Sequence, residues 1–154
     1  DSSVFEFCKI QYGKKFGTPG DNVKGGAIFA SDYGNLIVRN SLLNFNMVIC
    51  YTSGADPAAG GAVYCKKVNQ VIFEKNRYER NRSFTNGGAI YINTDCHTFI
   101  SNNYFLNNWA ISWLYSPPWI FVSGSGAAIF STDDLGPSPI ICNNQFLIIN
   151  HWEE

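Results

Sequence analysis

The stretch "KGGAIFASD", residues 24–32, decides the fold because the chain contains nearly the same phrase four times. Its two glycines would weaken an isolated strand. The phrase returns as "GGAVYCK" (60–66), "GGAIYIN" (87–93) and "GAAIFST" (126–132), with its alanines at positions 27, 62, 89 and 128, so the steps are 35, 27 and 39 residues. In each copy an Ile or Val and then a Phe or Tyr follow the alanine, so the copies match column by column.

A second motif follows each glycine motif. It centres on an asparagine 13, 14, 14 or 16 residues after the alanine, with an Ile or Phe three residues before it and a Leu, Tyr or Phe two residues after it. Asparagine tolerates left-handed backbone geometry at a bend, and stacked amides hydrogen bond along a sheet. We therefore predict an asparagine ladder along one corner of the fold. Its members are Asn40, Asn76, Asn103 and Asn144.

The repeat predicts an all-β fold, a parallel β-helix or β-solenoid. Each unit consists of short β-branched or aromatic stretches separated by turn residues, and no long segment has helical periodicity. Stacking gives each apolar stretch a like neighbour one turn away, which a single unit lacks. We expect one domain of about five turns, with units near residues 1–24, 25–59, 60–86, 87–125 and 126–154. The expected core column is Ile28, Val63, Ile90 and Ile129.

The two motifs together resemble those of a known family. "GGAI" (25–28), "GGAV" (60–63) and "GGAI" (87–90) carry one half, and "FEKN" (73–76) and "FLNN" (105–108) carry the other. This pattern is similar to the repeat of the polymorphic outer-membrane proteins of chlamydiae, found also in surface proteins of some protists. The fourth unit departs from it, with "GAAI" and with Ile141 in place of Phe. The resemblance implies a right-handed parallel β-helix, extracellular or on a cell surface, that serves in adhesion or as a structural stalk.

Bulk composition narrows the function further. Net charge is −1, only 15% of residues are charged and no run of Lys or Arg occurs, so electrostatic capture of nucleic acid is not indicated. No apolar run reaches the ~18 residues of a membrane span. The five cysteines have no CxxC spacing and only two histidines accompany them, so we expect no zinc site and no cofactor. Their redox state is left open, and we expect the chain to be part of a longer protein.

The longest insertion, between residues 108 and 126, is rich in aromatic residues. Two interpretations are open: a flap folded over the flank of the solenoid, or an exposed surface that binds a partner protein or a glycan. Pro117-Pro118 in its middle argues against regular strand pairing there. The expected partners are other protein subunits or further copies of this chain, possibly end to end. The candidate binding residues are Trp109, Trp113, Tyr115, Trp119 and Phe121.

An enzymatic alternative is a polysaccharide hydrolase, because pectin-degrading enzymes share the right-handed β-helix. The chain has "NTD" (93–95) and "DD" (133–134), and Asp95 and Asp134 each lie six residues after their alanines. Paired carboxylates can divide acid and base roles in glycoside hydrolysis. However, the G-H-G and R-I-K motifs of the polygalacturonases are missing, and His97 lies two residues from Asp95 rather than one turn away. We therefore expect no catalytic residues and a non-catalytic module.

A calcium site and an N-glycosylation site are two further interpretations of the polar residues. Calcium binding through Asp32, Asp95, Asp133 and Asp134 lacks EF-hand spacing, and Lys67 occupies the matching turn of another unit, so no metal site is expected. "NRS" at 81–83 fits the acceptor pattern for N-glycosylation at Asn81. Asn81 also belongs to a partly repeated column with Asn108, and an inward hydrogen bond is the competing interpretation.

Overall fold

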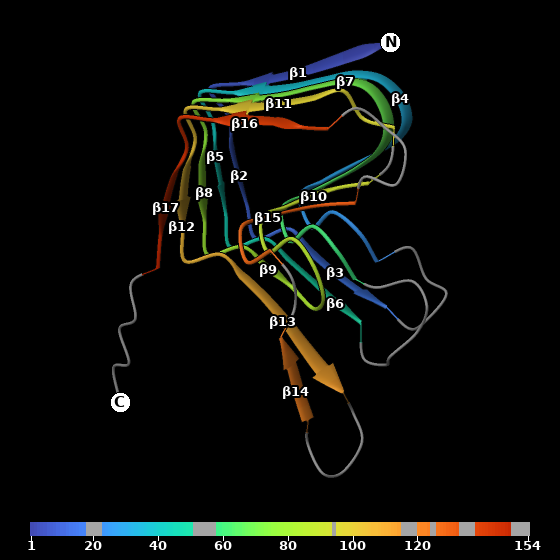
Figure 1. The fold of residues 1–154 in the computed structure, drawn as a ribbon, viewed down its shortest axis with the longest axis vertical. Coiled ribbons are helices and arrows are strands. Elements are labelled where there is room, and N and C mark those ends of the chain that lie inside the picture. The colour runs from blue at the N-terminus through green and yellow to red at the C-terminus, as the bar shows by residue number, and fades with distance from the viewer. Residues whose placement is uncertain are drawn as a thin grey trace.

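The computed structural model describes residues 1–17, 23–50, 58–93, 95–114, 120–123, 126–132 and 138–148, with side chains described for all of these except 111–114 and 120–123. The described strands form three sheets that the chain visits in a fixed order, turn after turn (Figure 1). The first sheet has the path β1-β4-β7-β10-β15 with β11 and β16 beside it, the second is β17-β12-β8-β5-β2, and the third is β14-β13-β9-β6-β3. This is a right-handed parallel β-helix of about five turns.

The strand bounds follow the turns. Turn one holds β1 (Ser2–Glu6), β2 (Lys9–Gln11) and β3 (Lys14–Gly17), and turn two holds β4 (Ile28–Arg39), β5 (Leu42–Asn44) and β6 (Met47–Cys50). Turn three holds β7 (Val63–Glu74), β8 (Arg77–Glu79) and β9 (Arg82–Ser83). Turn four holds β10 (Ile90–Ile92), β11 (Thr98–Ser101), β12 (Tyr104–Leu106), β13 (Trp109–Leu114) and its partner β14 (Ile120–Ser123). Turn five holds β15 (Ile129–Ser131), β16 (Ile140–Cys142) and β17 (Gln145–Leu147).

The core column lies in single file, as the repeat predicts. Val63 pairs with Ile28 on one side and Ile90 on the other, and Ile90 pairs with Ile129. A second interior column is aromatic: the ring of Phe105 stacks on Tyr78 at 4.9 Å and on Phe146 at 5.0 Å between centroids. Each turn thus excludes water by contact with its copies above and below.

The glycine motif forms the corner that enters the first sheet. Gly60 has a φ of +70°, which side chains with a Cβ rarely adopt. A Cβ on Gly61 would overlap the carbonyl oxygen of Gly88 and lie 2.7 Å from the backbone nitrogen of Arg82. The corner therefore runs too close to the next turn and to the third sheet to hold any larger residue there, which explains why the phrase begins with two glycines.

One part of the expected alignment is wrong by one residue. Counting three residues before and two after Asn40 places Ile37 and Leu42 in the columns of Phe73 and Tyr78, but the residues that pair with Phe73 and Tyr78 are Val38 and Leu43. Since side chains alternate across a strand, a shift of one residue exchanges the buried face for the exposed one. Val38 and Leu43 are the fully buried members.

We expect Gly88→Ala to destabilise the fold by about 3 kcal/mol, since the new Cβ would overlap the carbonyl oxygen of Ala127 and lie 2.6 Å from backbone atoms of Trp109. Ala127 occupies the same column one turn on, so Ala127→Gly is the matched control and should change stability by less than about 1 kcal/mol. Urea unfolding midpoints measure both. Equal effects of the two substitutions would contradict the close approach at this corner.

Candidate functional site

Asparagine side chains hold the corner between the first and second sheets. The Asn76 Oδ1 accepts the backbone N–H of Ser41 at 3.0 Å, and its Nδ2 donates to the carbonyl oxygen of Val38 at 2.7 Å. Asn103 repeats the arrangement one turn on, since its Oδ1 accepts the N–H of Asn76 at 2.8 Å. Asn144 in turn accepts the N–H of Asn103 at 2.9 Å. Three members of the expected ladder therefore lie in register and satisfy buried backbone groups that would otherwise lack partners.

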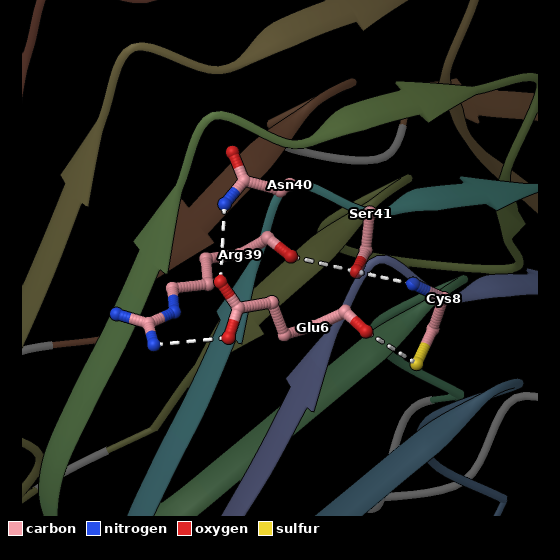
Figure 2. Close-up of polar contacts among 5 residues, drawn as sticks. All are labelled: Glu6, Cys8, Arg39, Asn40 and Ser41. Atoms are coloured by element: carbon pink, nitrogen blue, oxygen red, sulfur yellow. Dashed lines mark hydrogen bonds and ion pairs between the residues drawn. The ribbon is translucent and has the colours of Figure 1, made fainter.

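The fourth expected member, Asn40, is not in the ladder. Figure 2 shows the corner of the first two turns: Ser41 Oγ accepts the N–H of Cys8 at 3.0 Å and donates to the carbonyl oxygen of Arg39 at 2.7 Å. The Asn40 side chain is exposed and its Nδ2 reaches only Glu6 Oε1, at 3.4 Å. Asn40 has a φ of 50°, so it supplies the left-handed bend while Ser41 supplies the ladder oxygen. Two adjacent polar residues divide these roles, and the sequence alignment chose the wrong one.

A second ladder runs along the next corner, between the second and third sheets. Asn46 Oδ1 accepts the N–H of Gly13 at 2.9 Å, Asn81 Oδ1 accepts the N–H of Asn46 at 3.1 Å, and Asn108 Oδ1 accepts the N–H of Asn81 at 3.0 Å. The sequence pattern predicts only a partly repeated column here, Asn81 and Asn108. A signal was present, because each member lies five residues after a position of the first ladder: 41 and 46, 76 and 81, 103 and 108.

This ladder uses the side chain of Asn81, the candidate residue for N-glycosylation. The Asn81 side chain is 0% exposed, and its Nδ2 donates both to the carbonyl oxygen of Leu43 at 2.8 Å and to Asn108 Oδ1 at 2.9 Å. The nitrogen that a glycan would modify is thus used in full inside the fold. Of the two interpretations left open for Asn81, the structure shows the inward hydrogen bond, and a sugar at this atom is incompatible with the folded chain.

The aromatic insertion forms a β-hairpin on turn four. β13 pairs in parallel with β9 only through Trp109 and Ala110, and from Ile111 onward it pairs with β14 in the antiparallel sense. In Figure 1 this hairpin extends the third sheet away from the stacked turns. Trp113 pairs with Phe121 across it, and Trp109 at its base is 43% exposed. Tyr115 and Trp119 lie outside the described residues, on either side of Pro117-Pro118, so regular pairing flanks the prolines.

The carboxylates considered as candidates for hydrolysis or calcium binding lie at turns of the surface. Asp32 lies 4.0 Å from Lys67 Nζ, and Asp95 is exposed at a left-handed bend with a φ of 60°. Asn93 of the "NTD" motif donates to the Tyr64 hydroxyl at 2.9 Å. Asp133 and Asp134 lie outside the described residues. Within the described ranges, no group of three or more His, Cys, Asp and Glu side chains is placed to hold a metal ion.

Among the buried titratable groups of the core, Cys65 and Tyr78 have the strongly raised pKa values. Burial, and then the nearby Cys96, raises the pKa of the Cys65 thiol well above its ordinary value. Burial, and then Cys65, likewise raises the pKa of the Tyr78 hydroxyl, which makes no hydrogen bond of good geometry although the Asn76 side chain lies near it. None of the five cysteines forms a disulfide. These groups behave as neutral core residues rather than as nucleophiles.

A groove of about 720 Å³ follows the outside of the corner held by the first ladder. The guanidinium of Arg77 lies 5.2 Å from the centre of the Tyr104 ring, and its Nε lies 3.1 Å from Glu79 Oε2. Lys75 Nζ lies 3.6 Å from Glu74 Oε1. Because carboxylates accompany these cations, the groove offers aromatic and amide contacts rather than a strong net charge. Its exposed lining includes Phe7, Lys9, Asn40 and Asn102.

Comparisons with protein-family models, with curated proteins and with solved structures found no match for this chain. Among the described residues, no helix is long and apolar enough to cross a membrane.

We expect Asn103→Ala to destabilise the chain by about 2–3 kcal/mol, because the N–H of Asn76 and the carbonyl oxygen of Phe73 would lose their partners inside the fold. The neighbour Asn102 is exposed with a φ of 55°, so Asn102→Gly should be neutral or slightly stabilising. Urea unfolding of this adjacent pair measures the difference. A larger loss at residue 102 than at residue 103 would contradict the ladder.

The buried thiol and phenol predict a loss of stability at alkaline pH. A raised pKa in the folded state leaves their contribution complete below the unfolded values of about 8.5 for Cys and about 10 for Tyr, and removes it as the pH rises above them. We expect a urea midpoint that is level between about pH 6 and 8 and falls above about pH 9. Cys65→Ala should make the fall shallower, whereas an unchanged slope would contradict a protonated buried thiol.

Proposed function

We propose that this chain is a non-catalytic structural and adhesive β-helix module, extracellular or on a cell surface, that mediates contacts with other protein subunits. The observation that carries the proposal is the hairpin β13–β14, which departs from the rod after Ala110. The rest of turn four continues the repeat, whereas from Ile111 onward the hairpin strands pair with each other and not with β9. A projecting aromatic segment on a rigid scaffold is typical of a contact site.

The composition of the hairpin favours a protein partner. Its strands bring Trp113 and Phe121 into register, and Trp109 at its base is half-exposed. Large aromatic side chains contribute strongly to protein interfaces, because they bury much area at low entropic cost. Trp109, Trp113, Tyr115, Trp119 and Phe121 together remain the proposed binding residues, and a glycan is the second ligand class to assay.

The use of polar residues supports a structural rather than a catalytic role. The buried asparagines of both ladders are engaged with backbone groups, as the Asn76 and Asn81 contacts show. Several described charged side chains pair with each other at the surface, for example Arg39 with Glu6 at 3.0 Å. These groups stabilise corners and solvated faces.

The extracellular or cell-surface location and membership of the polymorphic outer-membrane type rest on the motifs. The glycine and asparagine motifs occupy the corners of a parallel β-helix, the architecture that the resemblance implies. This agreement of motif and corner is what supports the finer assignment.

Replacing residues 111–123 by a short Gly-Ser link tests the proposal. We expect the circular dichroism spectrum and the urea midpoint to stay close to those of the parent, because the excised strands pair chiefly with each other. We expect binding to extracellular-matrix proteins, glycan arrays or further copies to fall at least about tenfold. Phe99→Ser, which removes an aromatic residue 39% exposed on the first sheet, is the matched control. Unchanged binding and self-association after the deletion would refute the contact role.

A further inference from the structure

An apolar stripe runs along the outer face of the first sheet, across the strands β1, β4, β7, β11 and β16 (Figure 1). Side chains alternate between the two faces of a sheet. Ile72 lies between the fully buried Val71 and Phe73, so its side chain points away from the core. Strand pairing places one apolar residue of each turn in the same outward file. The members of the stripe are Val4, Ile37, Ile72, Phe99 and Ile140.

The stripe is exposed even where strands flank it on both sides. Ile37 and Ile72 are partly exposed, and Phe99 is 39% exposed. The other outward column of this sheet is aromatic and is covered, since its member Tyr64 is only 1% exposed. A hollow of about 400 Å³ lies beside the stripe, lined in part by Gln70, Ile72 and Phe99. The described chain therefore covers one outward apolar column of the sheet and leaves the other accessible.

Polar columns flank the stripe on both sides. The column two residues before the stripe carries mainly amide and hydroxyl groups, and the column two residues after it carries charges of both signs. An apolar centre with a polar rim is typical of a protein interface. The first column is Ser2, Asn35, Gln70 and His97, and the second is Glu6, Arg39, Glu74, Ser101 and Cys142.

We propose that this face binds a second copy of the chain, face to face, with the two rods antiparallel. The stripe repeats at one strand spacing, about 4.8 Å, so a partner that follows it needs a row of side chains with the same period. Another copy has such a row. A twofold axis between turns two and three sets Ile37 opposite Ile72 of the partner subunit. Each such pair occurs twice, as in any isologous contact.

Charge favours this register over the others. It places Arg39 opposite Glu74 of the partner subunit, twice, and brings together the amides of Asn35 and Gln70, which can both donate and accept hydrogen bonds. An antiparallel register centred on Ile72 would set Glu74 opposite itself. Parallel rods would set the charged column opposite the amide column. Of the arrangements that overlap four or more described turns, the proposed one alone brings opposite charges together across the contact.

The size of the contact predicts a reversible dimer. Four turns at about 4.8 Å and three outward columns at about 6.6 Å give about 400 Å² of flat area in each copy. This area is near the lower limit for specific interfaces, and we expect a dissociation constant between about 10 μM and 1 mM. The inference rests on the proposed function in that both concern contacts between proteins, but it uses a different face from the hairpin.

Sedimentation velocity of the full chain, with a thiol reductant and from about 10 μM to 1 mM, tests the proposal. The double variant Ile37→Thr/Ile72→Thr keeps both residues β-branched, so the strands should form as before. It removes apolar surface from the centre of the contact in both copies and should weaken the dimer at least about tenfold. Leu42→Thr, at a partly exposed position on the outer face of the second sheet, is the matched control and should leave the dimer unchanged.

A charge swap tests the register. Arg39→Glu sets like charges opposite each other at two places and should weaken the dimer at least about tenfold. Adding Glu74→Arg to that variant restores opposite charges and should recover most of the affinity. Arg77→Glu reverses the cation of an ion pair on the second sheet and should leave the dimer unchanged. Circular dichroism confirms that each variant is folded.

The outcomes separate the alternatives. A monomer at about 1 mM, or a dimer unaffected by Ile37→Thr/Ile72→Thr, overturns the proposal. Failure of Glu74→Arg to rescue Arg39→Glu overturns the antiparallel register and with it the proposal. Loss of matrix-protein binding in the double variant, without any dimer in the parent, assigns the face to a different protein and also overturns it.

The two proposed contacts can fail independently. Deleting residues 111–123 should leave this dimer unchanged, because the hairpin strands belong to the third sheet. Phe99→Ser should weaken the dimer several-fold, since Phe99 lies in the stripe, while binding of matrix proteins or glycans through the hairpin is retained. A dimer that is lost with the hairpin and kept in Phe99→Ser would overturn the assignment to this face.

Discussion

At the corners of the described turns, some backbone N–H groups are buried but cannot pair with a neighbouring strand, because the chain bends there. The solution is a side-chain oxygen from the next turn. Asn103 Oδ1 accepts the N–H of Asn76, and Asn108 Oδ1 accepts the N–H of Asn81. Since a buried unpaired amide costs about 1–3 kcal/mol, these contacts keep the described turns in one register although the turns differ in length. The core columns, the aromatic stacks and the glycine corner all depend on that register.

The third corner, between the third sheet and the first, is formed by the glycine motif rather than by an asparagine ladder. This difference explains where the long insertions lie. Two corners are held by amides and stay tight, whereas the long insertions enter around the glycine motif and the third sheet. Gly61 runs against Gly88 and Arg82, so the chain passes this corner only as bare backbone. The hairpin β13–β14 grows from the third sheet for the same reason: β13 can leave its partner β9 after two residues without disturbing either amide ladder. The largest differences in length between the turns thus lie on the flank away from the two amide ladders.

The sequence was sufficient to predict the parallel β-helix and the column from Ile28 to Ile129, because column identity survives loops of any length. It failed at Asn40, since two adjacent polar residues both suit a bend and only the pairing of Val38 with Phe73 decides between them. The buried state of Asn81 was likewise left open by its acceptor motif, which is local, while its partners Leu43 and Asn108 are far apart in sequence. The hairpin was unexpected because Pro117-Pro118 was given weight over the strand-forming residues on either side.

The backbone N–H groups at both corners donate one way along the chain: from Cys8 to Ser41, Asn76, Asn103 and Asn144, and from Gly13 to Asn46, Asn81 and Asn108, each accepting side-chain oxygen belongs to the later turn. During synthesis, which delivers the amino-terminal end first, the newest turn therefore emerges with its bends incomplete and closes only when its successor arrives. Assembly of the rod runs one turn behind the ribosome. Truncation from the carboxy-terminal side consequently strips corner N–H groups of their acceptors, whereas truncation from the amino-terminal side leaves the remaining corner N–H groups paired and instead removes the carbonyl oxygens that the Asn76 and Asn81 side-chain nitrogens use.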